Sequence, residues 1–306
     1  MSRIHEALKK AARERPPLTG LEARGPAIDI AIEIGKGLPP QHLDPLARKH
    51  NVGDGRPQHL DYDALVKHCA HPEWQVDTLT SVFRNPSAGN GAAERFRMLR
   101  SRLYHVASTR TLRRILVTSG VAGEGKTFVA ANLAQSIVQQ PERRVLLIDA
   151  DLRSPRLHLA FGATPAPGLT EYLRGEADEF QVIQKGADEN LCLICAGSHV
   201  DKPSELLLSP RMKQLLEKLT ALFEWIIIDS PPALPVQDAS DLAHLTDGVL
   251  LVLRAGATHT HVAEKAVSEF KSKNLLGVVL NQVKTGDTYG GYYYSQQNAG
   301  KVTPTA

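Results

Sequence analysis

The segment Gly120-Val-Ala-Gly-Glu-Gly-Lys126-Thr127 has the residue types and spacing of a phosphate-binding loop, G-x-x-x-x-G-K-[ST]. In such a loop the glycines allow backbone N–H groups to turn toward phosphate oxygens. The lysine amine reaches the β- and γ-phosphates, and the next hydroxyl ligates Mg²⁺. A chance glycine-rich turn is the alternative, but this motif follows an apolar run and opens a helical pattern. The residues expected to bind ATP here are Gly120, Gly123, Glu124, Gly125, Lys126, Thr127 and Phe128.

Carboxylates end two further apolar runs. Asp229 closes Trp225-Ile-Ile-Ile-Asp229, the Walker B form, whose carboxylate holds Mg²⁺ directly or through water. Asp149 and Asp151 lie two residues apart after Val145-Leu-Leu-Ile, where they can serve a metal, a water or a hydroxyl nucleophile. The alternative for Asp229 is a turn cap, and for the pair it is a solvated strand end. We expect Thr127, Asp149 and Asp229 to be the metal ligands.

Four of the seven tyrosines gather near the C-terminus, at Tyr289, Tyr292, Tyr293 and Tyr294. Their neighbours are Gly, Ser, Gln and Asn with no apolar period, which predicts a flexible segment without a core. Tyrosines on such a segment suit phosphoryl acceptance. An adhesive low-complexity tail or an aromatic contact strip is the alternative, and the phosphate-binding loop favours the acceptor interpretation.

The pattern around these sites predicts an α/β fold. Continuous apolar runs indicate strands buried on both faces, and therefore a mostly parallel sheet. Helical patterns between them indicate a doubly wound sheet flanked by helices, with ligands at the carboxyl ends of the strands. The predicted strands are 114–119, 144–149, 191–195, 225–229, 248–253 and 277–280, and the predicted helices are 127–140, 205–222, 238–245 and 259–273.

Composition and punctuation set the domain plan. The 306 residues carry a net charge of +3, too small to argue for nucleic acid, and three cysteines cannot form a disulfide framework. Without an apolar run of membrane-spanning length or a signal segment, we expect a cytoplasmic protein. Residues 1–90 are predicted to be an extension, with an amphipathic helix at 1–15, a Pro/Gly-rich linker over 16–60 and one short helix near 62–69. Residues 91–284 form the predicted catalytic domain, and 285–306 the flexible tail.

At this point the sequence resembles the bacterial tyrosine kinases, the P-loop kinases of capsule and exopolysaccharide synthesis. Asp149-Ala-Asp151-Leu-Arg153-Ser-Pro-Arg-Leu-His158 is similar to the Walker A′ segment of that family, and Asp229-Ser-Pro-Pro to its Walker B segment. Glu94-Arg-Phe-Arg97-Met-Leu-Arg100 fits its E-x-x-R-x-x-R motif, associated with subunit contacts in a ring. Lys202-Pro-Ser-Glu205 and the N-terminal Met1-Ser-Arg-Ile-His also resemble family segments. The resemblance covers roughly residues 90–295.

The resemblance implies a partitioning-ATPase-like P-loop fold and an ATP- and Mg²⁺-dependent protein-tyrosine autokinase. Lys126, Asp149 and Asp151 would be catalytic, one aspartate accepting or orienting the phenol proton. Asn281 would contact adenine, and Glu94, Arg97 and Arg100 would hold a ring-like homo-oligomer. The partner would be a membrane polysaccharide co-polymerase whose cytoplasmic tail activates the kinase and recruits it to the inner face of the membrane.

A partitioning-type ATPase switch or scaffold without kinase activity is the alternative function. Those relatives carry an additional lysine early in the phosphate-binding loop, where this chain has Val121. Val121 and the tyrosine tail both favour the kinase.

Overall fold

The computed structural model describes residues 28–31, 61–85, 89–186 and 190–283. The expected helix at 1–15, most of the expected linker and the tyrosine tail lie outside these ranges. Within them, the strands are β1 (Ile28–Ala31), β2 (Arg114–Ser119), β3 (Val145–Asp149), β4 (Ile183–Lys185), β5 (Leu191–Ile194), β6 (Trp225–Asp229), β7 (Gly248–Arg254) and β8 (Leu275–Asn281).

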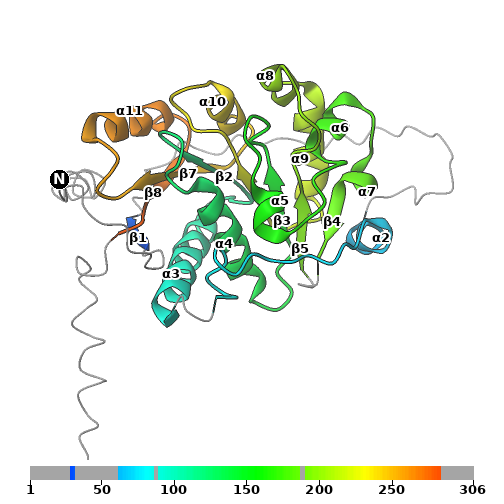
Figure 1. The fold of residues 1–306 in the computed structure, drawn as a ribbon, viewed down its shortest axis with the longest axis horizontal. Coiled ribbons are helices and arrows are strands. Elements are labelled where there is room, and N and C mark those ends of the chain that lie inside the picture. Colours follow the sequence, from blue (N-terminus) through cyan, green and yellow to red (C-terminus); the bar gives the residue numbers. More distant parts are fainter. Residues whose placement is uncertain (1–27, 32–60, 86–88, 187–189, 284–306) are drawn as a thin grey trace, which may run out of the picture.

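These strands form one sheet in the order β1-β8-β7-β2-β6-β3-β5-β4 (Figure 1). The inner strands all run parallel, whereas β1 and β4, at the two edges, are antiparallel to their neighbours. The doubly wound, mostly parallel sheet predicted from the continuous apolar runs is therefore confirmed. All six predicted strands are present with boundaries within two residues of the prediction.

Helices cover both faces of the sheet. They are α2 (Tyr62–His68), α3 (Gly89–Ala107), α4 (Lys126–Val138), α5 (Leu157–Phe161), α6 (Leu169–Arg174), α7 (Glu179–Val182), α8 (Pro203–Leu207), α9 (Pro210–Thr220), α10 (Asp238–Ala243) and α11 (Thr260–Phe270). In the described part of the chain, no helix combines the length and apolar character needed to cross a membrane.

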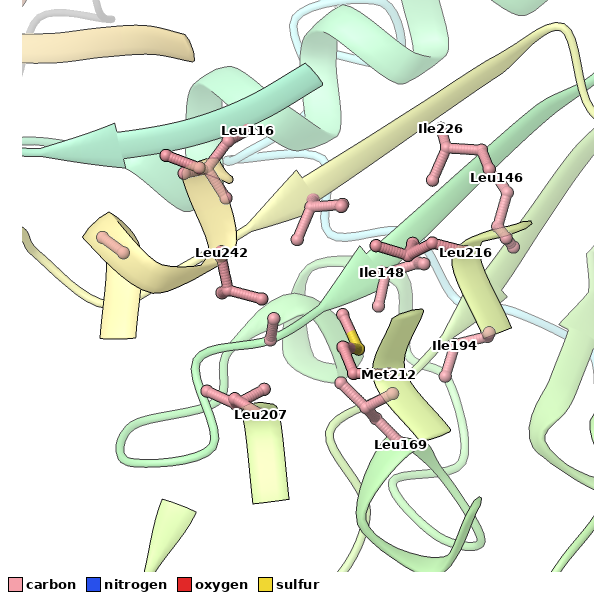
Figure 2. Close-up of a cluster of buried hydrophobic side chains, with 14 of the residues drawn as sticks. Leu116, Leu146, Ile148, Leu169, Ile194, Leu207, Met212, Leu216, Ile226 and Leu242 are labelled. Atoms are coloured by element: carbon pink, nitrogen blue, oxygen red, sulfur yellow. The ribbon is translucent and has the colours of Figure 1, made fainter. Parts of the chain in front are cut away.

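Residues of the inner strands enter two separate cores, one on each face of the sheet. Leu116 of β2 belongs to the core under α6, α9, α10 and α11, part of which Figure 2 shows. Its neighbours Ile115 and Val117 point to the other face, into the core under α3, α4 and α5. Because both faces are covered, an inner strand needs apolar residues at every position, and this explains the continuous runs.

The helices differ from the prediction in two ways. The helix expected over 205–222 is two helices, because Pro210 has no backbone N–H to donate and instead begins α9. The sequence patterns also omitted α3 and the short α5, α6 and α7. These last three contain only four to six residues, too few to display a helical period.

Strand β1 corrects the interpretation of 16–60 as a linker throughout. It pairs antiparallel with β8, with Ile28 opposite Asn281 and Ala31 opposite Val278. A signal for it was present in the sequence, since isoleucine recurs at every second position from Ile28 to Ile34. This period-two pattern is typical of a strand. The surrounding proline and glycine residues instead favoured the interpretation as a linker.

Residues 61–85 pack against the sheet and helices formed by the rest of the chain. The packed domain therefore includes residues before position 91, where its boundary was expected. The expected short helix is present as α2, and beyond it Ala70 bridges to Gln184 of β4. Further along, the ring of Trp74 packs on Phe161 of α5, with centroids 5.3 Å apart. The segment then reaches α4, where the side chain of Asn132 accepts a hydrogen bond from the Val82 N–H at 2.8 Å.

Asn132 supplies the first prediction. Its buried amide also donates to the carbonyls of Thr80 and Phe128, at 2.8 and 2.9 Å. Replacing it with alanine leaves the buried Val82 N–H without a partner and removes the bond to the Thr80 carbonyl, so we expect Asn132→Ala to lower the free energy of unfolding by about 2–4 kcal/mol in urea titrations. The control, Gln139→Ala at the exposed end of the same helix, should change it by less than about 0.5 kcal/mol. Equal effects of the two substitutions would refute this role.

Candidate active site

The carboxyl ends of three neighbouring strands bring the predicted catalytic residues together. β6 lies between β2 and β3, and its Asp229 stands in register with Val117 on one side and Asp149 on the other. The phosphate-binding loop leaves β2, and the segment holding Asp151 leaves β3. Because the strands are parallel, all these groups lie at the same end of the sheet, where the strands have their carboxyl ends.

The phosphate-binding loop turns through glycines with positive φ angles. Gly123 has φ 82° and Gly125 has φ 94°, values that other residues adopt at a cost. Gly125 is the N-cap of α4, so the first N–H groups of this helix face the position that phosphate would occupy. Glu124 stabilises the loop from behind: its buried carboxylate accepts from the Val121 N–H at 2.8 Å and from the Thr258 hydroxyl. Its side chain therefore supports the loop, and its backbone remains the group expected at the nucleotide.

Lys126 is held by a carboxylate. Its Nζ lies 2.8 Å from Oδ2 of Asp151, and their side chains are 13% and 3% exposed. Burial alone would favour the neutral amine, but the carboxylates of Asp229 and Asp151 outweigh it and raise the pKa of Lys126. The amine is thus a fixed positive charge at the base of the loop, as the motif requires.

Thr127 and Asp229 form the part of the site that fits Mg²⁺. The Thr127 hydroxyl donates to Oδ2 of Asp229 at 2.6 Å. The other oxygen, Oδ1, is buried with no hydrogen-bond partner, and such a carboxylate oxygen needs a cation or water. In the described residues no group of three or more His, Cys, Asp and Glu side chains forms a metal cage. Mg²⁺ is commonly bound by few protein ligands together with phosphates and waters, and a hydroxyl and a carboxylate are ligands of the kind it takes.

Asp149 is placed differently from the expected metal ligand. Its Oδ1 accepts from the N–H of Asp151 at 3.2 Å, and its Oδ2 accepts from those of Arg156 and Leu157 at 3.1 and 3.0 Å. Both oxygens therefore hold backbone groups of the Walker A′ segment, and Oδ2 does so at the start of α5. Asp229 has an unpaired buried oxygen and Asp151 lies beside the Lys126 amine, whereas the expected roles of Asp149 as a metal ligand and catalytic residue stay predictions.

Two predicted nucleotide-binding residues contact protein groups instead. The ring of Phe128 packs on Phe96 of α3, with centroids 5.9 Å apart, and its contact with nucleotide stays a prediction. Asn281 is 2% exposed, and its amide donates to the Glu124 carbonyl at 2.9 Å. Its contact with adenine stays a prediction, because in this structure the side chain supports the phosphate-binding loop.

A polar network missed by the sequence reasoning lies beside the Walker A′ segment. The Arg153 guanidinium binds the buried Asp238 of α10, with Nε 2.7 Å from Oδ2, and also donates to the Ser204 hydroxyl of α8 at 2.8 Å. Ser204 in turn donates to Asp238 at 2.6 Å. The network ties the segment carrying Asp151 to two helices. Arg153 and Ser204 stood in the quoted family segments, but no local signal marked Asp238.

The residues expected at subunit contacts divide into two groups. Glu94 and Arg97 form an exposed ion pair of 3.1 Å on α3. Arg100 is part-buried and donates to the Ser136 carbonyl of α4 in its own chain. The first two are therefore on the surface, whereas Arg100 also holds two helices of one subunit together.

The fold and the phosphate-binding site define the class of this protein. The CobQ/CobB/MinD/ParA nucleotide binding domain (CbiA) matches residues 115–295 of the chain. This range begins in β2, contains the phosphate-binding loop and all three aspartates, and extends beyond β8. The chain belongs to this group of nucleotide-binding domains.

Relatives narrow the class further. Tyrosine-protein kinase YwqD of Bacillus subtilis is 37% identical over 210 residues, which are 67% of this chain and 88% of that protein. Tyrosine-protein kinase wzc of Salmonella typhi is 32% identical over 273 residues, 82% of this chain but only 38% of that protein. The kinase domain of the Escherichia coli tyrosine kinase ETK has a TM-score of 0.63 at 32% identity, covering 72% of this chain and 87% of the solved one. The chain is a member of the bacterial tyrosine-protein kinases.

The buried carboxylates predict a pH effect on stability. Burial raises the pKa of Asp149, as does Asp229 beside it, and burial likewise raises the pKa of Asp229. The folded protein therefore holds protons that the unfolded chain has released above about pH 4. The free energy of unfolding should fall as pH rises from about 5 to 8, by up to about 1.4 kcal/mol per pH unit for each such proton. Unfolding in EDTA measures this slope.

The substitution Asp149→Asn should flatten that slope, because it removes one of the two titrating groups. Asp238→Asn is the contrast. Burial opposes ionisation of Asp238, but hydrogen bonds from Arg153 and Ser204 outweigh it and lower its pKa. This second substitution should leave the slope above pH 5 in place. An unchanged slope in Asp149→Asn would contradict the assignment.

Proposed function

We propose that this protein is an ATP- and Mg²⁺-dependent autokinase that phosphorylates tyrosines of its own C-terminal segment between subunits. The observation that carries the proposal is the position of Lys126. Lys126 belongs to the phosphate-binding loop, and its amine forms an ion pair with the Asp151 carboxylate. One movement of this amine toward phosphate would therefore also release a carboxylate oxygen.

The mechanism follows from that position. The N–H groups at the start of α4 and the Lys126 amine would hold the β- and γ-phosphates of ATP. The freed Oδ2 of Asp151 would then accept the proton of an incoming tyrosine as its oxygen attacks the γ-phosphorus in line with the departing ADP oxygen. A phenol has a pKa near 10, so it needs such a base at neutral pH. Bound Mg²⁺, held by Thr127 and Asp229, would neutralise charge on the phosphate oxygens.

The acceptors would be Tyr289, Tyr292, Tyr293 and Tyr294, which lie outside the described residues. Each phosphate adds about −1.5 to −2 charges, and clustered phosphotyrosines repel one another. Their accumulation would loosen a ring of subunits held together through Glu94, Arg97 and Arg100.

Membership of the family supports a proposal for the biological role. The kinase would regulate polymerisation or export of an exopolysaccharide or capsule. Its partner would be a membrane protein of the polysaccharide system whose cytoplasmic tail activates the kinase and brings it from the cytoplasm to the inner face of the membrane.

A mixture of two variants, each unable to phosphorylate its own tail, tests phosphoryl transfer between subunits. Full-length Lys126→Met keeps the acceptor tyrosines but lacks the phosphate-binding amine, and a chain ending before Thr288 keeps the site but lacks them. With Mg·ATP, the mixture should place phosphotyrosine within 289–294 of the Lys126→Met chain, whereas either chain alone should not. Lys202→Met, which removes an exposed lysine paired with Glu205, is the control and should phosphorylate itself normally. Absence of phosphotyrosine together with ATP hydrolysis would favour the ATPase switch.

The expected interface can be tested without disturbing the fold. An exposed ion pair is worth less than about 1 kcal/mol, so Glu94→Ala with Arg97→Ala should leave the unfolding midpoint nearly unchanged. If the pair makes subunit contacts, this double variant should sediment as smaller species and should lose most phosphorylation between subunits. Lys213→Ala with Glu217→Ala removes a comparable exposed pair from α9 and is the matched control. Equal sedimentation of both variants would place the interface elsewhere.

A further inference from the structure

Strand β8 is held on both sides where it ends. On one side β7 runs parallel to it, with Arg254 in register with Asn281, and the Ala255 N–H donates to the Asn281 carbonyl at 2.9 Å. On the other side β1 is antiparallel to it, and Ile28 stands opposite the same asparagine. Figure 1 shows β1 beside β8 at the edge of the sheet. The first residue of β1 is thus the one that pairs with Asn281.

Asn281 connects this strand end to the phosphate-binding loop. Its side-chain amide donates to the Glu124 carbonyl, and its Oδ1 accepts from the Gln282 N–H at 2.9 Å. The loop approaches it so closely that a Cβ on Gly125 would stand 2.0 Å from Nδ2. A shift of Asn281 would therefore shift the residues immediately before Lys126.

Strand β1 is a short strand at the edge of the sheet. It contains four residues, and α2 begins only after residues 32–61, a stretch able to span up to about 100 Å. The segment after α2 bridges to β4, at the opposite edge of a sheet about 35 Å wide. The pairing with β8, together with contacts to α3, is therefore what holds β1 at this edge. With β1 absent, the outer backbone groups of β8 would be unpaired, and its end would be held from one side only.

We propose that the outer edge of β8 is a docking surface for the N-terminal strand Ile28–Ala31, and that docking positions the phosphate-binding loop through Asn281. The occupant is this segment of the chain itself. Docked, it fixes the end of β8 and the Glu124 carbonyl. Undocked, it leaves a loop that binds nucleotide less tightly. Binding of nucleotide would in turn favour docking, because the two events share one free energy of coupling. The proposal concerns nucleotide affinity and holds whatever group accepts the phosphate.

The test breaks the strand and measures binding of Mg·ADP by calorimetry on the full chain. Successive residues of an antiparallel strand direct their N–H groups to opposite sides, so Asp29→Pro with Ile30→Pro must remove one N–H from the β8 ladder. We expect this pair to weaken Mg·ADP binding about three- to tenfold, the loss that corresponds to one hydrogen bond. Gln41→Pro with His42→Pro, the same change outside the strand, should leave affinity unchanged.

A double-mutant cycle with Asn281→Ala tests the route. Asn281→Ala should itself weaken binding, and breaking the strand in that background should add less than about twofold, because both changes act through one side chain. If the proline pair lowers the unfolding midpoint, Asp29→Gly with Ile30→Gly takes its place in the cycle. Unchanged affinity in the strand variants, or losses that add in full, would overturn the proposal. Since the readout is binding, failure of tyrosine phosphorylation would not affect the result.

Discussion

The ion pair between Lys126 and Asp151 is the contact on which the site depends. A lysine that is largely buried requires an opposite charge close by, because desolvation otherwise favours the neutral amine. Here the carboxylates come from strand ends that the sheet places next to each other. The order β2-β6-β3 sets Asp229 between the phosphate-binding loop and the Walker A′ segment. The parallel arrangement of three adjacent strands is therefore what keeps one cation and three aspartates together.

The same contact links nucleotide binding to catalysis in the proposed mechanism. Asp151 cannot act as a base while its Oδ2 is paired with the lysine, and phosphate is the competing partner that would release it. Asp149 has a supporting role, since its oxygens hold the backbone that presents Asp151. Arg153, with Asp238 and Ser204, fixes the other side of that segment. The site is thus a set of supported loops, in which each reactive side chain is held by a second residue.

Much of this arrangement could be predicted from the sequence. The positions of the inner strands could be predicted from the continuous apolar runs, because a strand buried on both faces requires apolar residues at nearly every position. The phosphate-binding motif is local, since its glycines, lysine and threonine all act within one turn. The edge strand β1 and the contacts of 61–85 were not anticipated, because such segments are held by pairing with distant residues. The contact between the Asn281 amide and the Glu124 carbonyl, 157 positions away, likewise had no local signal in the sequence.

The most direct test of the account is to map phosphorylated residues by mass spectrometry after incubating the full chain with Mg·ATP. The comparison is Asp151→Asn, which keeps the shape of the side chain but removes the base. The account predicts phosphotyrosine within 289–294 in the native chain. It also predicts a loss of at least about a hundredfold in rate in Asp151→Asn, with Mg·ADP still bound. Phosphotyrosine formed at the native rate by Asp151→Asn, or a native chain that hydrolyses ATP without modifying any tyrosine, would contradict it.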